Sequence, residues 1–552
     1  MREIWNIKQR TEKDLLHQLL KNRAIAEANA DSFLNPDYGE LHDPFLFTEM
    51  HKATDRIWEA IEKGEKILIY SDYDADAVTA NATIFRALKF LGATAEVYIP
   101  DRFSEGYGLN LQAFESIKAQ GVRVVITVDC GTNSVAEAQF CKKNGINLII
   151  TDHHEITGEK PRAFALINPK NPGEKYPYCE LTGVAVAWKL VCALFSSKEK
   201  SGLPGGFEKW FLDFVAIGTI ADCHSLLGEN RILVKFGLQV LAKTKWPGLR
   251  ALIESAAPRE LDAYAVSFMI APRINAAGRI DHARIAFDLL VEDDPGRARQ
   301  MAAELEKLNS KRQMLTEVVV SEARAQLAQL ENRKILLASG TDWPKGVVGL
   351  VAGKLCEEFG KPVLVMEKGA EHATGSARST PSFNIVNALS YSKEFLVKYG
   401  GHAAAAGFTL RSSDIDFLYK KLLEYADENL REEDLAKTLE LEAEIYPGEI
   451  NFQTFGEIEK LAPFGVDNRR PRFALPGLIL EEFRTVGKGQ AHLQLSARAG
   501  EKIFRCIGFN LGWASAELKP GDKIDLACEL ISDEWNGFKN LKLRILDFRK
   551  NE

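Results

Sequence analysis

Three carboxylates at alternating positions follow a short apolar run early in the chain. The run Ile67–Tyr70 leads into Asp72, Asp74 and Asp76. The carboxyl end of a buried strand, where the chain opens toward the next helix, is where open α/β sheets place their ligands. Three neighbouring carboxylates repel one another unless a cation lies among them, so the segment favours a divalent metal site. The alternative is an Asp-rich turn that caps the following helix.

Two later apolar runs end in residues of the same kind. Val124–Val128 leads into Asp129, and Leu148–Ile150 is followed closely by His153 and His154. An adjacent pair of histidines can also cap a helix and pack against it. Because three separate strands end in metal-type ligands, we expect a metal site. The mixture of imidazole and carboxylate suits manganese, zinc or iron as well as magnesium.

A further acidic residue, Asp222, directly follows the apolar helix expected at Trp210–Ile220. It becomes another ligand if the fold returns it to the strand ends, and otherwise it is an ordinary turn former. Cys223 and His224 come next and could act as soft ligands for zinc, although a single Cys-His step has low specificity.

Basic residues among small ones mark a second kind of site. Arg273 and Arg279 flank Asn275, two alanines and a glycine, and such small residues let a backbone approach a ligand closely. Guanidinium suits phosphate, so the segment predicts an anion site, with a structural salt bridge as the equal alternative. The turn Gly400–His402 brings backbone N–H groups and an imidazole to one point, which suits a phosphate or is simply a tight turn.

Length, charge and cysteine usage bound the class of protein. The 552 residues allow three or four domains. A formal net charge of −7 argues against coating nucleic acid by bulk electrostatics, so a polyanion site must be built from specific residues. The eight cysteines form no CxxC pair, which indicates neither a zinc ribbon nor a disulfide framework. Without a signal-peptide core or an apolar run of about 18 residues, we expect a cytoplasmic protein with no membrane segment.

The order of the expected elements indicates an α/β fold with several domains. Strands and helices alternate from Lys66 to Thr151, which predicts a parallel sheet with crossover helices. A long uninterrupted helix then leads to a second α/β domain. The last part has short strands, with a hairpin turn at Trp535–Gly537, that could close into an OB-like barrel. The predicted boundaries are an N-terminal helical segment at 1–64, a catalytic domain at 65–296, a connector helix at 297–332, a second domain at 333–430 and a barrel at 438–552.

The ordered set of motifs resembles the DHH phosphoesterases. SDYDADA, VDCG, TDHHE and the Asp222 segment have the order and spacing of the four motifs of that family. The later PRINAAGR, WPKGVVG, GSAR, GGHAAAAGF and APFGVDN, with the terminal β region, are similar to those members that add a DHHA1 domain and an OB-like domain and degrade single-stranded DNA. The resemblance covers the chain from about Phe33 to Phe548.

This resemblance implies a metal-dependent exonuclease that removes 5′-mononucleotides from the 5′ end of single-stranded DNA, in recombination and repair. It implies two divalent ions, Mn²⁺ or Mg²⁺. The implied ligands are Asp74, Asp76, Asp129, His153 and Asp222, with Asp72 and His154 beside them. The implied contacts to phosphate and strand are Arg279, Asn275, Ser376, Arg378 and His402. The residues that would act in catalysis are His154, His402, Arg378 and Arg279. The resemblance also suggests a helicase and a single-strand-binding protein as partners of a monomer.

One departure from the family pattern is visible in the first motif. That motif usually ends in Asp-Gly, whereas Asp76 is followed here by Ala77. If the position needs a positive φ, alanine costs about 1 kcal/mol, and if it lies inside the helix alanine is harmless.

Two other functions stay open at this point. One is a DHH phosphodiesterase that acts on short oligonucleotides or cyclic dinucleotides, and the terminal β region argues against it. The other is a metal-free DNA-binding scaffold, and the complete set of acidic and histidine ligands argues against that.

Overall fold

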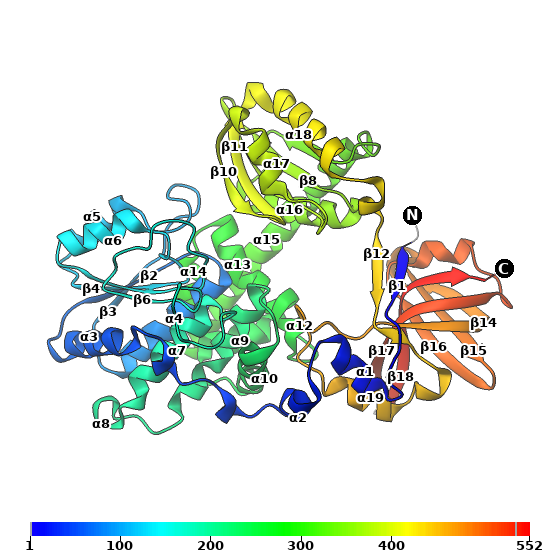
Figure 1. The fold of residues 1–552 in the computed structure, drawn as a ribbon, viewed down its shortest axis with the longest axis horizontal. Helices are drawn as coiled ribbons and strands as arrows, with labels where there is room; N and C mark the ends of the chain where they lie inside the picture. Colours follow the sequence, from blue (N-terminus) through cyan, green and yellow to red (C-terminus); the bar gives the residue numbers. More distant parts are fainter. Residues whose placement is uncertain (1–2, 536–537, 552) are drawn as a thin grey trace. The chain divides into compact units, whose positions relative to one another are not determined.

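The computed structural model describes residues 3–535 and 538–551, which form two compact units (Figure 1). One unit comprises Met1–Asp37 together with Ala436–Glu552, and the other comprises Tyr38–Leu435. The segment expected at 1–64 is therefore divided between the units. The physical reason is a short strand near the start of the chain: β1 (Ile4–Ile7) pairs in parallel with β12 (Thr438–Leu441).

A five-stranded parallel sheet forms the centre of the larger unit. Its order is β3-β2-β4-β5-β6, with the bounds Ala95–Tyr98, Ile67–Ser71, Val124–Val128, Asn147–Thr151 and Ala165–Ile167. Ser71 lies opposite Val128, and Val128 lies opposite Thr151, so three strands end in line. The expected parallel sheet is confirmed, and the residues that follow β2, β4 and β5 leave the same edge of it.

Helices cover both faces of this sheet. Ile69 of β2 faces one core and Tyr70 the other, because a strand has a period of two. Helices of the first core include α3 (Met50–Glu62), α4 (Ala75–Phe90), α7 (Gly183–Ser196), α9 (Leu212–Ala221), α10 (Gly228–Leu241), α11 (Pro247–Ala256), α13 (Ala271–Ile280) and α14 (Arg284–Val291). Those of the second are α5 (Leu111–Ala119) and α6 (Val135–Lys143). Although α9 is apolar on every side, no helix among the described residues is both long and apolar enough to cross a membrane.

One long helix, α15 (Pro295–Ala328), leads from the sheet domain to a second α/β domain. Leu305 packs in the first core, whereas Leu327 packs in the core of the second domain, so the helix is anchored at both ends. The second sheet has the order β10-β11-β9-β8-β7, with the bounds Leu396–His402, Ala405–Arg411, His372–Arg378, Val363–Lys368 and Leu336–Gly340. Its helices are α16 (Lys345–Phe359), α17 (Ile385–Tyr391) and α18 (Ile415–Asn429).

The smaller unit contains a β-barrel. Its strands are β13 (Ala443–Glu444), β14 (Phe473–Val486), β15 (His492–Ala499), β16 (Lys502–Gly508), β17 (Lys523–Trp535) and β18 (Phe538–Lys550). The sheet order is β13-β14-β15-β16-β18-β17, and it closes because β14 also pairs with β17. This closure confirms the expected OB-like barrel. The turn expected at Trp535–Gly537 includes Asn536 and Gly537, which lie outside the described residues.

Candidate active site

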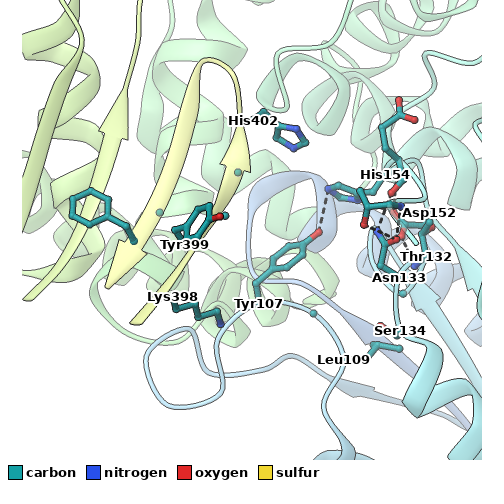
Figure 2. A pocket seen from close by; sticks show the side chains of 18 of the residues that line it. Tyr107, Leu109, Thr132, Asn133, Ser134, Asp152, His154, Lys398, Tyr399 and His402 are labelled. Carbon is teal, nitrogen blue, oxygen red and sulfur yellow. Dashed lines mark hydrogen bonds and ion pairs between the residues drawn. The ribbon is translucent and has the colours of Figure 1, made fainter. Parts of the chain in front are cut away.

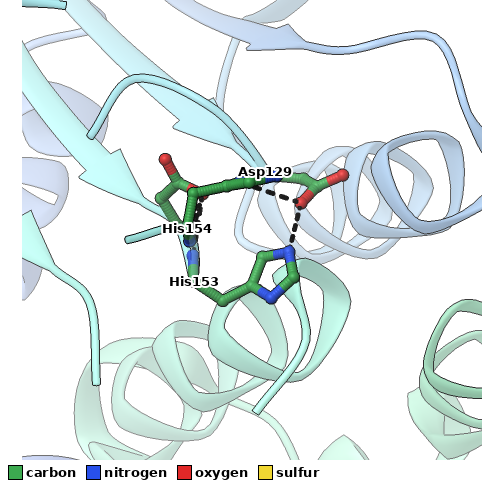
Figure 3. A group of neighbouring side chains, drawn as sticks. Asp129, His153 and His154 are labelled. Atoms are coloured by element: carbon green, nitrogen blue, oxygen red, sulfur yellow. Dashed lines mark hydrogen bonds and ion pairs between the residues drawn. The ribbon is translucent and has the colours of Figure 1, made fainter. Parts of the chain in front are cut away.

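The strand ends bring three of the expected ligands together. Asp129 Oδ1, after β4, is 3.0 Å from His153 Nε2, after β5 (Figure 3). His153 Nε2 is also 3.7 Å from Asp222 Oδ2, at the end of α9. Asp129 and His153 are buried, and the Asp222 side chain is 28% exposed. The fold thus returns Asp222 to the strand ends across about 70 residues of sequence.

Asp129 is held in a restrained backbone conformation. Its φ is +58°, which is uncommon for a residue other than glycine, and its N–H donates to Thr151 O at 2.9 Å. The start of α7 crosses directly over its side chain, since a Cβ at Gly183 would lie 2.5 Å from the Asp129 Cβ. The backbone of α7 therefore limits the space around the carboxylate, whose Oδ1 lies toward His153.

The N-terminus of α7 holds Asp76. Asp76 Oδ2 accepts from Gly183 N at 2.7 Å, and Oδ1 accepts from Val184 N at 3.0 Å. Backbone N–H groups at a helix start stabilise a negative charge. Each carboxylate oxygen keeps a second lone pair, so these bonds orient Asp76 without using up its capacity to bind a metal.

The first turn of α4 is capped twice. Asp74 Oδ1 accepts from Ala77 N at 3.0 Å, so the capping alternative holds for this residue. Asn275 Oδ1 accepts from Ala75 N at 2.9 Å, which ties α13 to α4. Asn275 is thus engaged in positioning the acidic segment, a contact that its motif did not suggest. Ala77 lies inside the helix, where alanine brings no strain.

Three polar atoms in this cluster are buried without a hydrogen-bond partner. They are Asp72 Oδ1, Asp129 Oδ1 and His153 Nδ1. Burial, and then the charge of Asp74, raise the pKa of Asp72 well above its ordinary value. Burial and the charge of Asp76 do the same for the pKa of Asp129. Buried, unpaired carboxylates that repel one another fit a site for cations.

The pKa values of the two adjacent histidines are shifted in opposite directions. Burial lowers the pKa of His153 to about 3, so its ring is neutral and able to bind a metal. Burial also opposes charge on His154, but the hydrogen bond from its Nδ1 to Asp152, at 2.8 Å, outweighs this and raises the pKa of His154 to about 9. His154 Nε2 is 3.1 Å from the Tyr107 hydroxyl. The sequence argument from residues that follow the strands gave no role to Asp152 or Tyr107.

A cleft of about 970 Å³ opens between the sheet domain and the second domain (Figure 2). Tyr107 and His154 line one side of it. Lys398, Tyr399 and His402, all on β10, line the other side. A volume of this size holds a nucleotide-sized ligand. The expected phosphate contact His402 thus lies on the same cleft as His154.

Two partly buried arginines add positive charge near the acidic segment. Arg378 Nη1 donates to Ser376 Oγ at 2.7 Å, and Arg279 Nη1 donates to Gly346 O at 3.2 Å. Among the described residues, no carboxylate lies within ion-pair distance of either guanidinium. The salt-bridge alternative therefore fails for Arg279, but it holds for Arg273, whose Nε is 2.5 Å from Glu306 Oε2. Burial, with the nearby charge of Arg102, lowers the pKa of Arg279 to about 9, which still leaves it a cation at neutral pH.

Arg102 is a basic residue that sequence reasoning missed. Its guanidinium lies over the Tyr73 ring, 4.8 Å from the centroid, and its charge acts on Arg279, Arg378 and Asp72. The one available signal was its place shortly after β3, on the same edge as the other strand ends.

Three family models match the chain. They are the DHH family, N-terminal domain, at residues 66–219, the DHHA1 domain at 332–428 and the RecJ OB domain at 441–547. These matches confirm the resemblance to the DHH phosphoesterases and the expected α/β fold with a DHHA1 domain and an OB-like barrel.

Characterised relatives extend the similarity to nearly the whole chain. The single-stranded-DNA-specific exonuclease RecJ of Bacillus subtilis (strain 168) is 39% identical over 98% of this chain and 68% of its own length. The Escherichia coli (strain K12) protein of the same name is 30% identical over 90% of this chain and 89% of its own. The crystal structure of RecJ in complex with Mn²⁺ from Thermus thermophilus matches with a TM-score of 0.82 at 31% identity, covering 100% of this chain and 80% of that one.

Proposed function

We propose a function from one premise: the chain belongs to the RecJ family of single-stranded-DNA-specific exonucleases. On this premise it is a metal-dependent enzyme that hydrolyses the phosphodiester bonds of single-stranded DNA. It starts at the 5′ end and releases 5′-mononucleotides, in recombination and repair. The observation that carries the proposal is the convergence of Asp129, His153 and Asp222 next to His154, which lines the cleft.

The residues that would hold two divalent ions, Mn²⁺ or Mg²⁺, are Asp74, Asp76, Asp129, His153 and Asp222, with Asp72 beside them. The unpartnered oxygens of Asp72 and Asp129 and the neutral ring of His153 support this donor set. When bound, such ions supply a hydroxide nucleophile at neutral pH and neutralise charge at the scissile phosphate. The protein then needs no strong general base of its own.

The basic side of the cleft would hold the phosphates of the strand. Arg378 is oriented by Ser376, and Arg279 is oriented by the Gly346 carbonyl, so both guanidinium groups are preorganised before a phosphate arrives. His402, at the tip of a hairpin, would donate a further hydrogen bond. These residues stabilise negative charge and fix the position of the 5′ end.

His154 would place a positive charge beside the reacting phosphate. Its bond to Asp152 keeps the ring protonated at neutral pH, and Tyr107 fixes the plane of the ring. A charged imidazole at the cleft surface stabilises a phosphate oxygen as negative charge develops there.

The barrel would bind the incoming strand, as OB folds commonly do. We also propose that the chain works as a cytoplasmic monomer with a helicase and a single-strand-binding protein as partners. Co-purification with each partner, and light scattering of the isolated chain, test these assignments.

The central experiment offers end-labelled single-stranded DNA, duplex DNA and a dinucleotide to the protein in Mn²⁺ or Mg²⁺. We expect mononucleotides to accumulate from the single strand alone, and none to form after chelation of the metal. Cleavage of the dinucleotide alone would instead support an oligonucleotide phosphodiesterase. Strand binding without any cleavage would support a scaffold.

A further inference from the structure

His224 lies beside the expected ligands without a part in the mechanism above. Its Nε2 is 3.2 Å from Asp222 Oδ2, the oxygen that also lies 3.7 Å from His153 Nε2. The ring centroids of the two histidines are 4.9 Å apart. The three side chains offer ligand atoms that all lie within 4.8 Å of one another. Two imidazoles therefore converge on one carboxylate oxygen.

The other ring nitrogen fixes the orientation of His224. His224 Nδ1 is 3.2 Å from the backbone carbonyl oxygen of Glu180, and a carbonyl oxygen only accepts, so Nδ1 is the donor. Asn230 Nδ2 donates to the same carbonyl at 2.6 Å and holds it in place. Metal-binding histidines typically donate their second N–H to a carbonyl or carboxylate in this manner.

The ring nitrogen directed at Asp222 is therefore Nε2. With Nδ1 bonded to the Glu180 carbonyl, Nε2 is the atom that a metal shared with the Asp222 oxygen would take. The side chain of His224 is only 16% exposed, so the group lies within the site rather than on its surface.

The separations agree with two ligands on one ion. Ligand atoms 3.2 Å apart, each about 2.1 Å from a metal, subtend an angle of about 100° at that metal. The pair formed by His153 and Asp222, 3.7 Å apart, subtends about 125° on the same basis. Both values lie near those of neighbouring ligands in ordinary coordination spheres.

We propose that His224 is a direct ligand of the metal ion bound at Asp222, and that it biases this ion toward Mn²⁺ over Mg²⁺. The inference rests on the proposed function. Imidazole suits first-row transition metals, whereas Mg²⁺ prefers oxygen ligands and retained water. A second imidazole beside His153 therefore strengthens binding of Mn²⁺ far more than binding of Mg²⁺.

The first test measures metal affinity rather than cleavage. Isothermal titration of Mn²⁺ and of Mg²⁺ is carried out on the wild type, His224→Gln and the control His372→Gln, an exposed histidine at the start of β9. In His224→Gln we expect the Mn²⁺ dissociation constant to rise about 10–100-fold and the Mg²⁺ constant to change by less than about threefold. In His372→Gln we expect neither to change. Equal Mn²⁺ affinity in His224→Gln and wild type overturns the proposal.

A second measurement needs no variant. In wild-type crystals soaked with Mn²⁺, the anomalous peak should lie about 2.0–2.2 Å from His224 Nε2. A peak bound by His153 and Asp222 but more than about 3 Å from His224 would mean that His224 only shares a proton with Asp222, and would overturn the proposal.

The outcomes separate this inference from the proposed function. A wild type that cleaves single strands and binds Mn²⁺ without His224 defeats the inference alone. A wild type that binds no Mn²⁺ at the strand ends defeats both. Weakened Mn²⁺ binding and unchanged Mg²⁺ binding in His224→Gln, together with single-strand cleavage by the wild type and by His372→Gln, support both.

Discussion

The acidic and basic sides of the cleft are built by different means. On the acidic side, short carboxylates are fixed by backbone groups: α7 holds Asp76 through two N–H bonds, and Asp74 caps α4. On the basic side, Arg378 reaches in from the second sheet on a long side chain, and its Nη1 donates to Ser376 Oγ and to the Ala377 carbonyl. Metal ligands must lie within tenths of an ångström of their positions, whereas a cation attracts a phosphate over several ångströms. The difference teaches that side-chain positions are fixed most tightly where the metal would bind.

The largest loss of activity is expected from a substitution on the acidic side. Asp129→Asn keeps the size of the side chain and tolerates the positive φ, but it removes the charge. We expect single-strand cleavage to fall on the order of a thousandfold or more. In chelator the thermal midpoint should stay level or rise, because repulsion among buried carboxylates is relieved. Substantial activity in this variant would exclude Asp129 from the site.

Metal binding itself should stabilise the larger unit. An ion that binds only the folded state adds about 2.7 kcal/mol to the free energy of unfolding at 100 times its dissociation constant. Thermal unfolding with and without Mn²⁺ measures this, and Asp129→Asn should lose most of the increment. An equal Mn²⁺ response from both proteins would place the binding elsewhere.

A change on the basic side should be milder. Arg378→Ala removes a charged hydrogen-bond donor, and we expect cleavage of a 5′-phosphorylated strand to fall about 10–100-fold, mainly through KM. Steady-state kinetics separate KM from kcat. Arg411→Ala, at an exposed end of β11, is the matched control and should match the wild type. If Arg378→Ala lost as much cleavage activity as Asp129→Asn, the two sides of the cleft would be equally sensitive to substitution, contrary to this prediction.

The smallest effect is expected from the bond between Tyr107 and His154. Tyr107→Phe deletes one hydroxyl, 3.1 Å from His154 Nε2, and keeps the ring. Because Asp152 still holds the charge of the ring and Tyr107 only orients it, we expect kcat to fall about 2–10-fold. Single-turnover cleavage measures this step, and a variant with wild-type kcat would show that Asp152 orients His154 unaided.

Much of the acidic side could be predicted from local sequence. Asp74, Asp129 and His153 each follow an apolar run that makes a buried parallel strand, and parallel strands expose their carboxyl ends along one edge. The family resemblance favoured Asp222 as a ligand, whereas its helix end alone left a ligand and a turn former both open. The capping roles of Asp74 and Asn275 show that both interpretations of an Asp-rich strand end can hold at once.

Other features lay beyond local pattern. No periodicity near Ile4 predicts that it pairs with Thr438, because strand pairing joins residues of any separation. Arg102 and Tyr107 lie in a loop without a repeated motif, and only the folded loop brings them to the cleft.

The sequence by itself determined the chemistry of this protein. Apolar strands alternate with helices, and acidic and imidazole residues follow the strands. The order of these motifs identifies a phosphoesterase. The tertiary structure alone decided which atoms meet. It turned His224 toward Asp222, brought His402 of β10 to the same cleft as His154 and left Asp72 Oδ1 without a hydrogen-bond partner. The physical reason is that residue type and spacing fix local conformation, whereas ligand geometry depends on packing between segments hundreds of residues apart.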